Sequence, residues 1–147
     1  MSLDASPLRG NELPALAKAL SAAGLPFDDI SLPGRVFFRF AMRGGETVAY
    51  GGIELYGPAA LLRSIVVLPA HRRHGYGRAI VDRLLNEARV AKVDYAYLIT
   101  TSARSFFEHV GFTVIDRGAA PASILGTRQA AGLCPASAPL LVKRLDR

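Results

Sequence analysis

The sequence lacks most of the features that would place it outside the ordinary globular proteins. Cys134 is the single cysteine among 147 residues, which excludes a disulfide within the chain and favours a reducing compartment. No apolar run approaches the roughly 18–20 residues that crossing a bilayer requires. The N-terminus lacks the basic-then-apolar pattern of a secretory signal, and repeats or low-complexity tracts are missing. We therefore expect one cytoplasmic domain over residues 1–147.

The composition is that of a folded domain with an anionic partner. Apolar residues make up 50% of the chain and charged residues 20%, which excludes a disordered or collagen-like chain. The formal net charge is +6, as expected for a protein that meets a nucleotide, a nucleic acid or a membrane surface. Net charge alone does not choose among these three.

The spacing of apolar residues predicts alternating helices and strands. Expected helices cover residues 11–24, 78–92 and 102–112. Expected strands cover residues 35–43, 46–56, 60–68, 95–101, 112–117 and 139–145. Asn11 is the expected N-cap of the first helix, and Gly44-Gly45 joins the first two strands. The strand–helix–strand crossover makes strands 60–68 and 95–101 parallel, so we predict an α/β (or α+β) fold with a mixed sheet of about six to seven strands.

A basic loop with two glycines connects the strand at 60–68 to the next helix. Gly75 and Gly77 lie among Arg72, Arg73, His74 and Arg78. Backbone N–H groups at a helix N-terminus and the helix dipole both favour an anion, and glycine lets the backbone approach it. The spacing is not that of a dinucleotide fingerprint, and Gly-Lys-Ser/Thr is absent. A solvated basic turn remains the alternative.

Two motifs carry a resemblance to a known family. Val67-x-Pro69-x-x-Arg72-x-x-Gly75-x-Gly77 resembles the central motif of the GCN5-related N-acetyltransferases (GNAT), and "ARSFFEHVGF" resembles their later helix. The resemblance covers residues 35–147 well. It implies the GNAT fold, with the parallel strands splayed at an acetyl-CoA site and helices flanking the sheet, and it implies acetyl-CoA as acetyl donor.

The resemblance also implies which residues contact acetyl-CoA. The pantetheine arm would pair with the backbone of Ile65, Val66 and Val67. The remaining expected contacts belong to the pyrophosphate loop and to the later helix: Arg72, Arg73, His74, Gly75, Tyr76, Gly77, Arg78, Ala79, Ser102, Phe106 and Phe107.

The C-terminal part is similar to the acetyltransferase domain of N-acetylglutamate synthases and to short stand-alone amino-acid N-acetyltransferases, some of them linked to arsenic resistance. That similarity implies a small amino-acid-like amine as acceptor. Candidate acceptor contacts are Arg63, Thr101, Arg128, Cys134 and Ser137. The Arg-x-Ser of glutamate-using synthases is Pro135-Ala136-Ser137 here, which puts glutamate in doubt. The alternative interpretation of Arg63 is a solvated side chain on a strand. For Cys134 the alternative is a small buried hydrophobic side chain.

The catalytic groups depart from the family pattern. The family helix carries a tyrosine that protonates the departing thiolate, but position 107 is phenylalanine. Thr100 is a candidate for assisting the departure of the thiolate, and the alternative is that it only ends a strand or caps a helix. Glu54 is the candidate general base, with a solvent-facing carboxylate as its alternative.

These observations predict an acetyl-CoA-dependent N-acetyltransferase in which the amine attacks directly in a ternary complex. The alternative is a non-catalytic acyl-CoA sensor that has lost its acid at Phe107. We expect no metal, because the three histidines and one cysteine lack ligand spacing. We also expect no nucleic acid as a partner, since no aromatic platform accompanies the basic loop. A membrane is not expected as a partner either, and a homodimer is possible.

Overall fold

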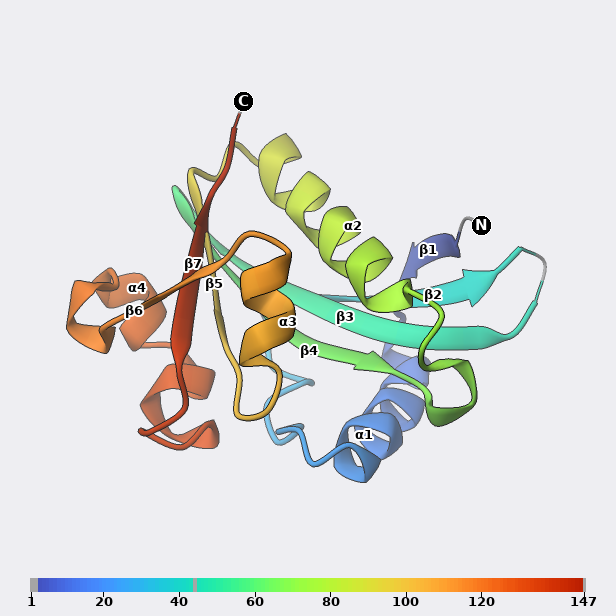
Figure 1. The fold of residues 1–147 in the computed structure, drawn as a ribbon. Helices are drawn as coiled ribbons and strands as arrows, with labels where there is room; N and C mark the ends of the chain where they lie inside the picture. The colour runs from blue at the N-terminus through green and yellow to red at the C-terminus, as the bar shows by residue number, and fades with distance from the viewer. Residues whose placement is uncertain (1–2, 44, 147) are drawn as a thin grey trace. The chain divides into compact units, whose positions relative to one another are not determined.

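The computed structural model describes residues 3–43 and 45–146 (Figure 1). Its strands form a seven-stranded sheet in the order β1-β2-β3-β4-β5-β7-β6. Strands β4 and β5 are parallel, whereas the pairs β1/β2, β5/β7 and β6/β7 are antiparallel. The predicted mixed sheet with one parallel pair is therefore confirmed. The strands are β1 (Leu3–Pro7), β2 (Arg35–Met42), β3 (Thr47–Tyr56), β4 (Ala59–Val67), β5 (Tyr95–Ile99), β6 (Thr113–Ile115) and β7 (Leu140–Arg144).

The chain divides into two compact units. The first unit contains Met1–Ile53 and Arg63–Leu84, and the second contains Glu54–Leu62 and Leu85–Arg147. The expectation of one domain stays a prediction. Within residues 3–43 and 45–146, none of the helices has the length and apolar character that crossing a membrane requires.

In the first unit, two helices cover opposite faces of the strands (Figure 1). Helix α1 (Leu13–Ala22) buries Leu16 and Leu20 against Phe37, Tyr50 and Val66. Helix α2 (Tyr76–Val90) belongs to this unit as far as Leu84. This part packs on the other face, where Ile80 and Leu84 lie against Gly51 of β3. Successive residues of a strand point to opposite faces, which is why neighbouring residues of β3 serve different helices.

The first unit departs from the sequence prediction at its N-terminus. Strand β1 was not predicted. Asn11 is not the N-cap: it lies within a 3₁₀ turn (Gly10–Glu12), and α1 begins at Leu13. Glu12 closes the turn instead, because its Oε1 accepts a hydrogen bond of 2.9 Å from the Arg9 N–H. Of the predicted Gly44-Gly45 turn between the two strands, Gly44 lies outside the described residues.

In the second unit, an apolar cluster lies along one face of the strands. It buries Ala59, Leu61, Tyr97, Ala120, Ile124 and Leu140. The parallel register runs from Ala59 opposite Tyr95 to Leu61 opposite Tyr97. Helix α3 (Arg104–His109) is shorter than predicted, and the chain then turns at Gly111, whose φ is 105°. Three further pieces were not predicted, namely a 3₁₀ turn (Arg117–Ala119), α4 (Ala122–Leu125) and a π-helical turn (Gln129–Leu133).

Candidate functional site

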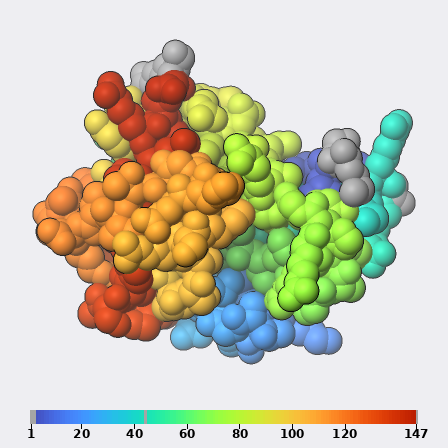
Figure 2. All heavy atoms as spheres, viewed as in Figure 1, coloured from blue at the N-terminus to red at the C-terminus, as the bar shows by residue number. Residues whose placement is uncertain are grey.

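The loop between β4 and α2 has an exposed, strongly basic surface. Arg72, Arg73, His74 and Arg78 are exposed, and Figure 2 shows the segment around residue 75 (green) at the surface. The backbone adopts the left-handed region at Arg73 (φ 68°) and Gly75 (φ 76°). A left-handed residue is costly without glycine, so Arg73 stores local backbone strain. Such conformations turn backbone N–H groups towards a common concave side.

This loop is anchored to the strand that precedes it. Arg72 Nε donates to the carbonyl oxygen of Val67 at 3.0 Å. The His71 N–H donates to the Leu68 carbonyl at 2.9 Å, and His71 Nε2 lies 3.3 Å from Glu46 Oε2. These contacts hold the start of the loop while its basic tip stays exposed.

The residues of this loop fit an anionic phosphate group. A Cβ added at Gly75 would meet no atom within 4 Å, so the loop is open on that side. The first N–H groups of α2 have no partner within the helix. Tyr76 begins this helix and is only 5% exposed, so its contribution is expected from its backbone. The sequence between Pro69 and Val81 contains no acidic residue to oppose a phosphate.

Strand β4 contains a left-handed residue directly before the predicted pantetheine-pairing segment. Ser64 has φ 56°, which places a local distortion between Arg63 and Ile65. Val66 is buried against α1, whereas Ile65 and Val67 are half-buried. Sequence reasoning missed Ser64, because a serine gives no glycine-like signal for a positive φ.

Arg63 has an internal partner that the sequence did not reveal. Its NH1 and NH2 lie 2.6 and 2.5 Å from the Asp29 carboxylate oxygens, and its guanidinium lies 5.4 Å from the Phe37 ring centroid. Arg35 also donates to Asp29, at 3.1 Å. The solvated alternative for Arg63 is therefore wrong. Acceptor binding by Arg63 stays a prediction, and the pairing with Asp29 disfavours it.

The two arginines control the charge of the Asp29 side chain. Burial by itself raises the pKa of Asp29, which is 0% exposed. The hydrogen bond and charge of Arg63, followed by those of Arg35, outweigh burial and hold the pKa below its ordinary value. Asp29 is therefore an ionised anchor at neutral pH.

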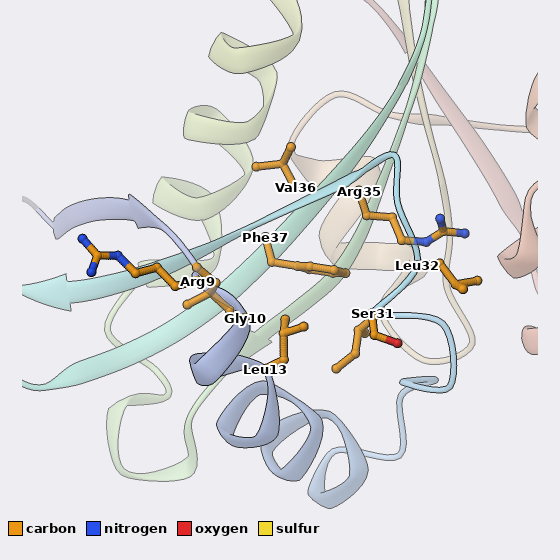
Figure 3. Close-up of a pocket in the computed structure, with 10 residues that line it drawn as sticks. Arg9, Gly10, Leu13, Ser31, Leu32, Arg35, Val36 and Phe37 are labelled. Carbon is orange, nitrogen blue, oxygen red and sulfur yellow. The ribbon is translucent and has the colours of Figure 1, made fainter.

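A separate pocket of about 320 Å³ lies between α1, the segment before it and the start of β2 (Figure 3). Leu13, Ser31 and Phe37 surround it, and the guanidinium ends of Arg9 and Arg35 point to opposite sides. Strand β3 lies between β2 and β4 in the sheet. At ordinary strand spacing, the backbones of β2 and β4 are therefore about 10 Å apart. We therefore do not assign this pocket to the reacting groups.

In the second unit, the candidate base is not solvent-facing. Glu54 is 0% exposed, so that alternative is wrong. Its carboxylate accepts a hydrogen bond from the Tyr56 hydroxyl. Sequence reasoning missed Tyr56, although residues two apart on a strand share a face and offered the signal.

The segment that follows β5 has mainly structural contacts. Thr100 follows the end of β5, and its Oγ1 accepts a hydrogen bond of 3.0 Å from the Ala103 N–H. The N-cap of α3 is Ala103 rather than Thr100, so Thr100 takes the strand-end alternative, and its catalytic role stays a prediction. Thr101 and Ser102 are exposed, and Phe106 is half-buried. Phe107 is 7% exposed, with ring centroids 5.1 Å from Phe106 and 6.0 Å from Phe112. Its ring therefore belongs to an internal aromatic cluster.

The late segment is held together by a residue that the sequence analysis did not single out. Arg117 donates to the carbonyl oxygens of Ala130, Pro135 and Ala138 at 3.1, 2.9 and 3.0 Å. These contacts bring together the stretch of chain that carries three of the five acceptor candidates, Arg128, Cys134 and Ser137. Arg128 and Ser137 are exposed on it.

Cys134 occupies the interior of the same segment. It is 8% exposed, and its Sγ lies 3.1 Å from Gln129 Oε1. This agrees with a small buried side chain, the alternative considered for it, and leaves substrate contact a prediction. Across the described ranges, no group of three His, Cys, Asp or Glu side chains is arranged to hold a metal ion.

Comparisons with known proteins identify the family of the chain. The family model of the acetyltransferase (GNAT) domain matches residues 34–114. An amino-acid acetyltransferase of Mycobacterium tuberculosis (strain ATCC 25618 / H37Rv) is 37% identical over 73 residues. Those residues are 49% of this chain and 41% of that protein, so the chain spans less than half of this relative.

Solved structures share the fold. N-acetylglutamate synthase from Neisseria gonorrhoeae, complexed with coenzyme A and N-acetyl-glutamate, has a TM-score of 0.80 at 14% identity and covers 100% of this chain and 36% of that one. A Mycobacterium tuberculosis protein in complex with CoA has a TM-score of 0.74 at 19% identity and covers 97% and 99% of the two chains. At these identities the likeness concerns the fold.

Proposed function

Because the chain belongs to the GNAT acetyltransferase family, we propose that it transfers the acetyl group of acetyl-CoA to the primary amine of a small amino-acid-like molecule. The amine attacks directly while donor and acceptor are bound together. The amino-acid acetyltransferase relative supports this acceptor class.

The basic loop is the observation that carries the proposal. It presents exposed Arg72, Arg73 and Arg78, an open side at Gly75 and the N-terminus of α2, all of which suit the phosphates of coenzyme A. Acetyl-CoA supplies an acetyl thioester, whose carbonyl carbon is open to attack by a neutral amine. The backbone of Ile65–Val67 would hold the pantetheine arm beside the loop.

Removal of the amine proton is assigned to Glu54. An amine is protonated at neutral pH, and only its neutral form is a nucleophile, so a base raises the reactive fraction. Glu54 is a buried carboxylate at the end of β3. Its burial makes it part of the interior of the domain rather than of its solvated surface.

The acceptor contacts are assigned to the late segment. Arg128 and Ser137 are exposed there, and Arg117 holds the surrounding backbone through three carbonyl oxygens. A guanidinium and a hydroxyl suit the carboxylate of an amino acid. We further propose that the chain is one cytoplasmic domain and that it forms a homodimer. Light scattering of the purified protein checks the homodimer through its molar mass.

The experiment is thiol release from acetyl-CoA across a panel of amino acids and related amines, corrected for hydrolysis. Release that depends on both substrates is the expected result. Glu54→Gln should lower turnover by about 10²-fold or more and leave acetyl-CoA affinity nearly unchanged. The loss should shrink as the pH rises, because the amine then loses its proton without help.

A non-catalytic acyl-CoA sensor is the second candidate. The observation in its favour is Phe107, which has no hydroxyl and lies within an aromatic cluster. A protein that binds acetyl-CoA in calorimetry but releases no thiol with any amine would support the sensor and contradict the transferase.

A further inference from the structure

Glu54 and Tyr56 form a dyad at the end of β3. The Tyr56 hydroxyl donates a hydrogen bond to Glu54 Oε1. The two residues are two positions apart on one strand, so their side chains leave the sheet on the same face. Both belong to the second unit.

The two members of the dyad differ in exposure. Glu54 is 0% exposed, so its carboxylate does not meet solvent. Tyr56 is half-buried and packs against the apolar cluster of the second unit, which includes Ile124 of α4. A molecule arriving from solvent therefore meets Tyr56 more readily than Glu54.

We propose that Tyr56 is the catalytic residue that contacts the acceptor amine, and that Glu54 receives the proton through it. This inference rests on the proposed function. The ammonium group of the acceptor gives a proton to the Tyr56 oxygen, while the hydroxyl proton of Tyr56 passes to Glu54 Oε1. The ammonium becomes a neutral amine, the carboxylate becomes a carboxylic acid, and Tyr56 ends unchanged.

This arrangement resolves a difficulty of the buried base. A carboxylate without solvent access can take a proton directly from the substrate amine only if the surrounding side chains move. A tyrosine hydroxyl both donates and accepts a hydrogen bond, so it can pass a proton between two groups that do not touch. A purely structural Tyr56 would only satisfy the buried carboxylate, and the two roles predict different kinetics.

The test is a double-mutant cycle of Tyr56→Phe, Glu54→Gln and the double variant. Each is assayed for kcat, for the KM of the best amine in the panel and for acetyl-CoA affinity by calorimetry. Thermal unfolding and circular dichroism verify that each variant is folded. Tyr97→Phe is the matched control, because Tyr97 is a tyrosine buried in the same apolar cluster.

Removing either residue of one proton path interrupts the whole path, so removing both costs little more activity than removing one. We expect Tyr56→Phe and Glu54→Gln each to lower kcat by about 10²-fold or more, and the double variant to be no worse than the singles within about three-fold. Acetyl-CoA affinity should stay the same in all three. Tyr97→Phe should keep the wild-type kcat.

Three results would overturn the inference. If Tyr56→Phe keeps its turnover while Glu54→Gln loses it, then Glu54 acts directly. If the two losses multiply in the double variant, the residues act independently and no proton passes from Tyr56 to Glu54. If the wild-type protein releases no thiol with any amine, the proposed function itself fails, and the relay fails with it before any variant is made.

Discussion

Arg63 and Asp29 form a bidentate ion pair in which both side chains are almost completely buried. The two N–O distances are 2.6 and 2.5 Å, and the side chains are 1% and 0% exposed. The pair joins β4 to the connection between α1 and β2, 34 residues earlier in the chain. Because Arg63 immediately precedes Ser64 and the predicted pantetheine-pairing residues, the pair also fixes the strand that the proposed cofactor site depends on.

Asp29→Asn should strongly destabilise the protein. Removing one partner of a buried pair leaves the other charge buried and uncompensated, which costs about 3–5 kcal/mol. Denaturant unfolding measures the free energy. Glu108→Gln is the control, since its partner Arg104 lies 3.3 Å away at the exposed surface, where a pair contributes at most about 1 kcal/mol. Equal losses from the two variants would contradict a dominant role for the buried pair.

The stabilisation by Asp29 should disappear in acid. Arg63 and Arg35 lower the pKa of Asp29 in the folded state against the effect of burial, so below the unfolded value of about 3.9 the unfolded chain takes up the proton first. The contribution is therefore complete at neutral pH and declines as the pH falls from about 4 towards the folded-state pKa.

Unfolding free energies of the wild type and of Asp29→Asn, measured from about pH 7 to about pH 3, check this linkage. The gap between the two proteins should narrow at the acid end. Other carboxylates titrate in both proteins and cancel in the difference. A gap that stays constant over the whole range would show that the charge of Asp29 does not carry the stabilisation.

Gly52→Ala should destabilise the first unit. A Cβ at Gly52 would stand 2.5 Å from Phe37 Cδ1, and the same ring lies under the Arg63 guanidinium. Forcing the ring aside costs about 1–3 kcal/mol. Gly10→Ala is the matched control, because a Cβ there meets nothing within 4 Å. A Gly52→Ala protein as stable as this control would mean that Phe37 relocates freely.

Gly77→Val should weaken acetyl-CoA binding without unfolding the protein. A branched side chain at this position blocks the approach of phosphate to the helix N-terminus. We expect an affinity loss of about ten-fold or more in calorimetry. Gly118→Val is the control, since a Cβ at Gly118, in the second unit, meets no atom within 4 Å. Unchanged affinity in Gly77→Val would remove the phosphate assignment of this loop.

Local patterns of residues were enough to predict the mixed sheet, its parallel pair and the loop that follows β4. Alternating and helical apolar periods arise between residues a few positions apart, so a strand such as β2 or a helix such as α2 is encoded locally. The glycines and basic side chains of the loop are equally local. The ends of elements depend on a choice between neighbouring polar residues: the turn before α1 is closed by Glu12 rather than by Asn11.

The surroundings of Glu54 and Arg63 could not be predicted from the local sequence, because they depend on how distant segments pack. Glu54 lies between Ile53 and Leu55 in β3, and Arg63 lies beside Ser64 in the otherwise apolar β4. A polar residue in such a strand is solvated or buried according to what covers its face of the sheet. Arg63 is buried because Asp29 reaches it from a loop 34 residues away. Glu54 is buried with Tyr56 as its donor on a strand covered from elsewhere in the chain. Burial depends on contacts between distant segments, and no local pattern of residues encodes those.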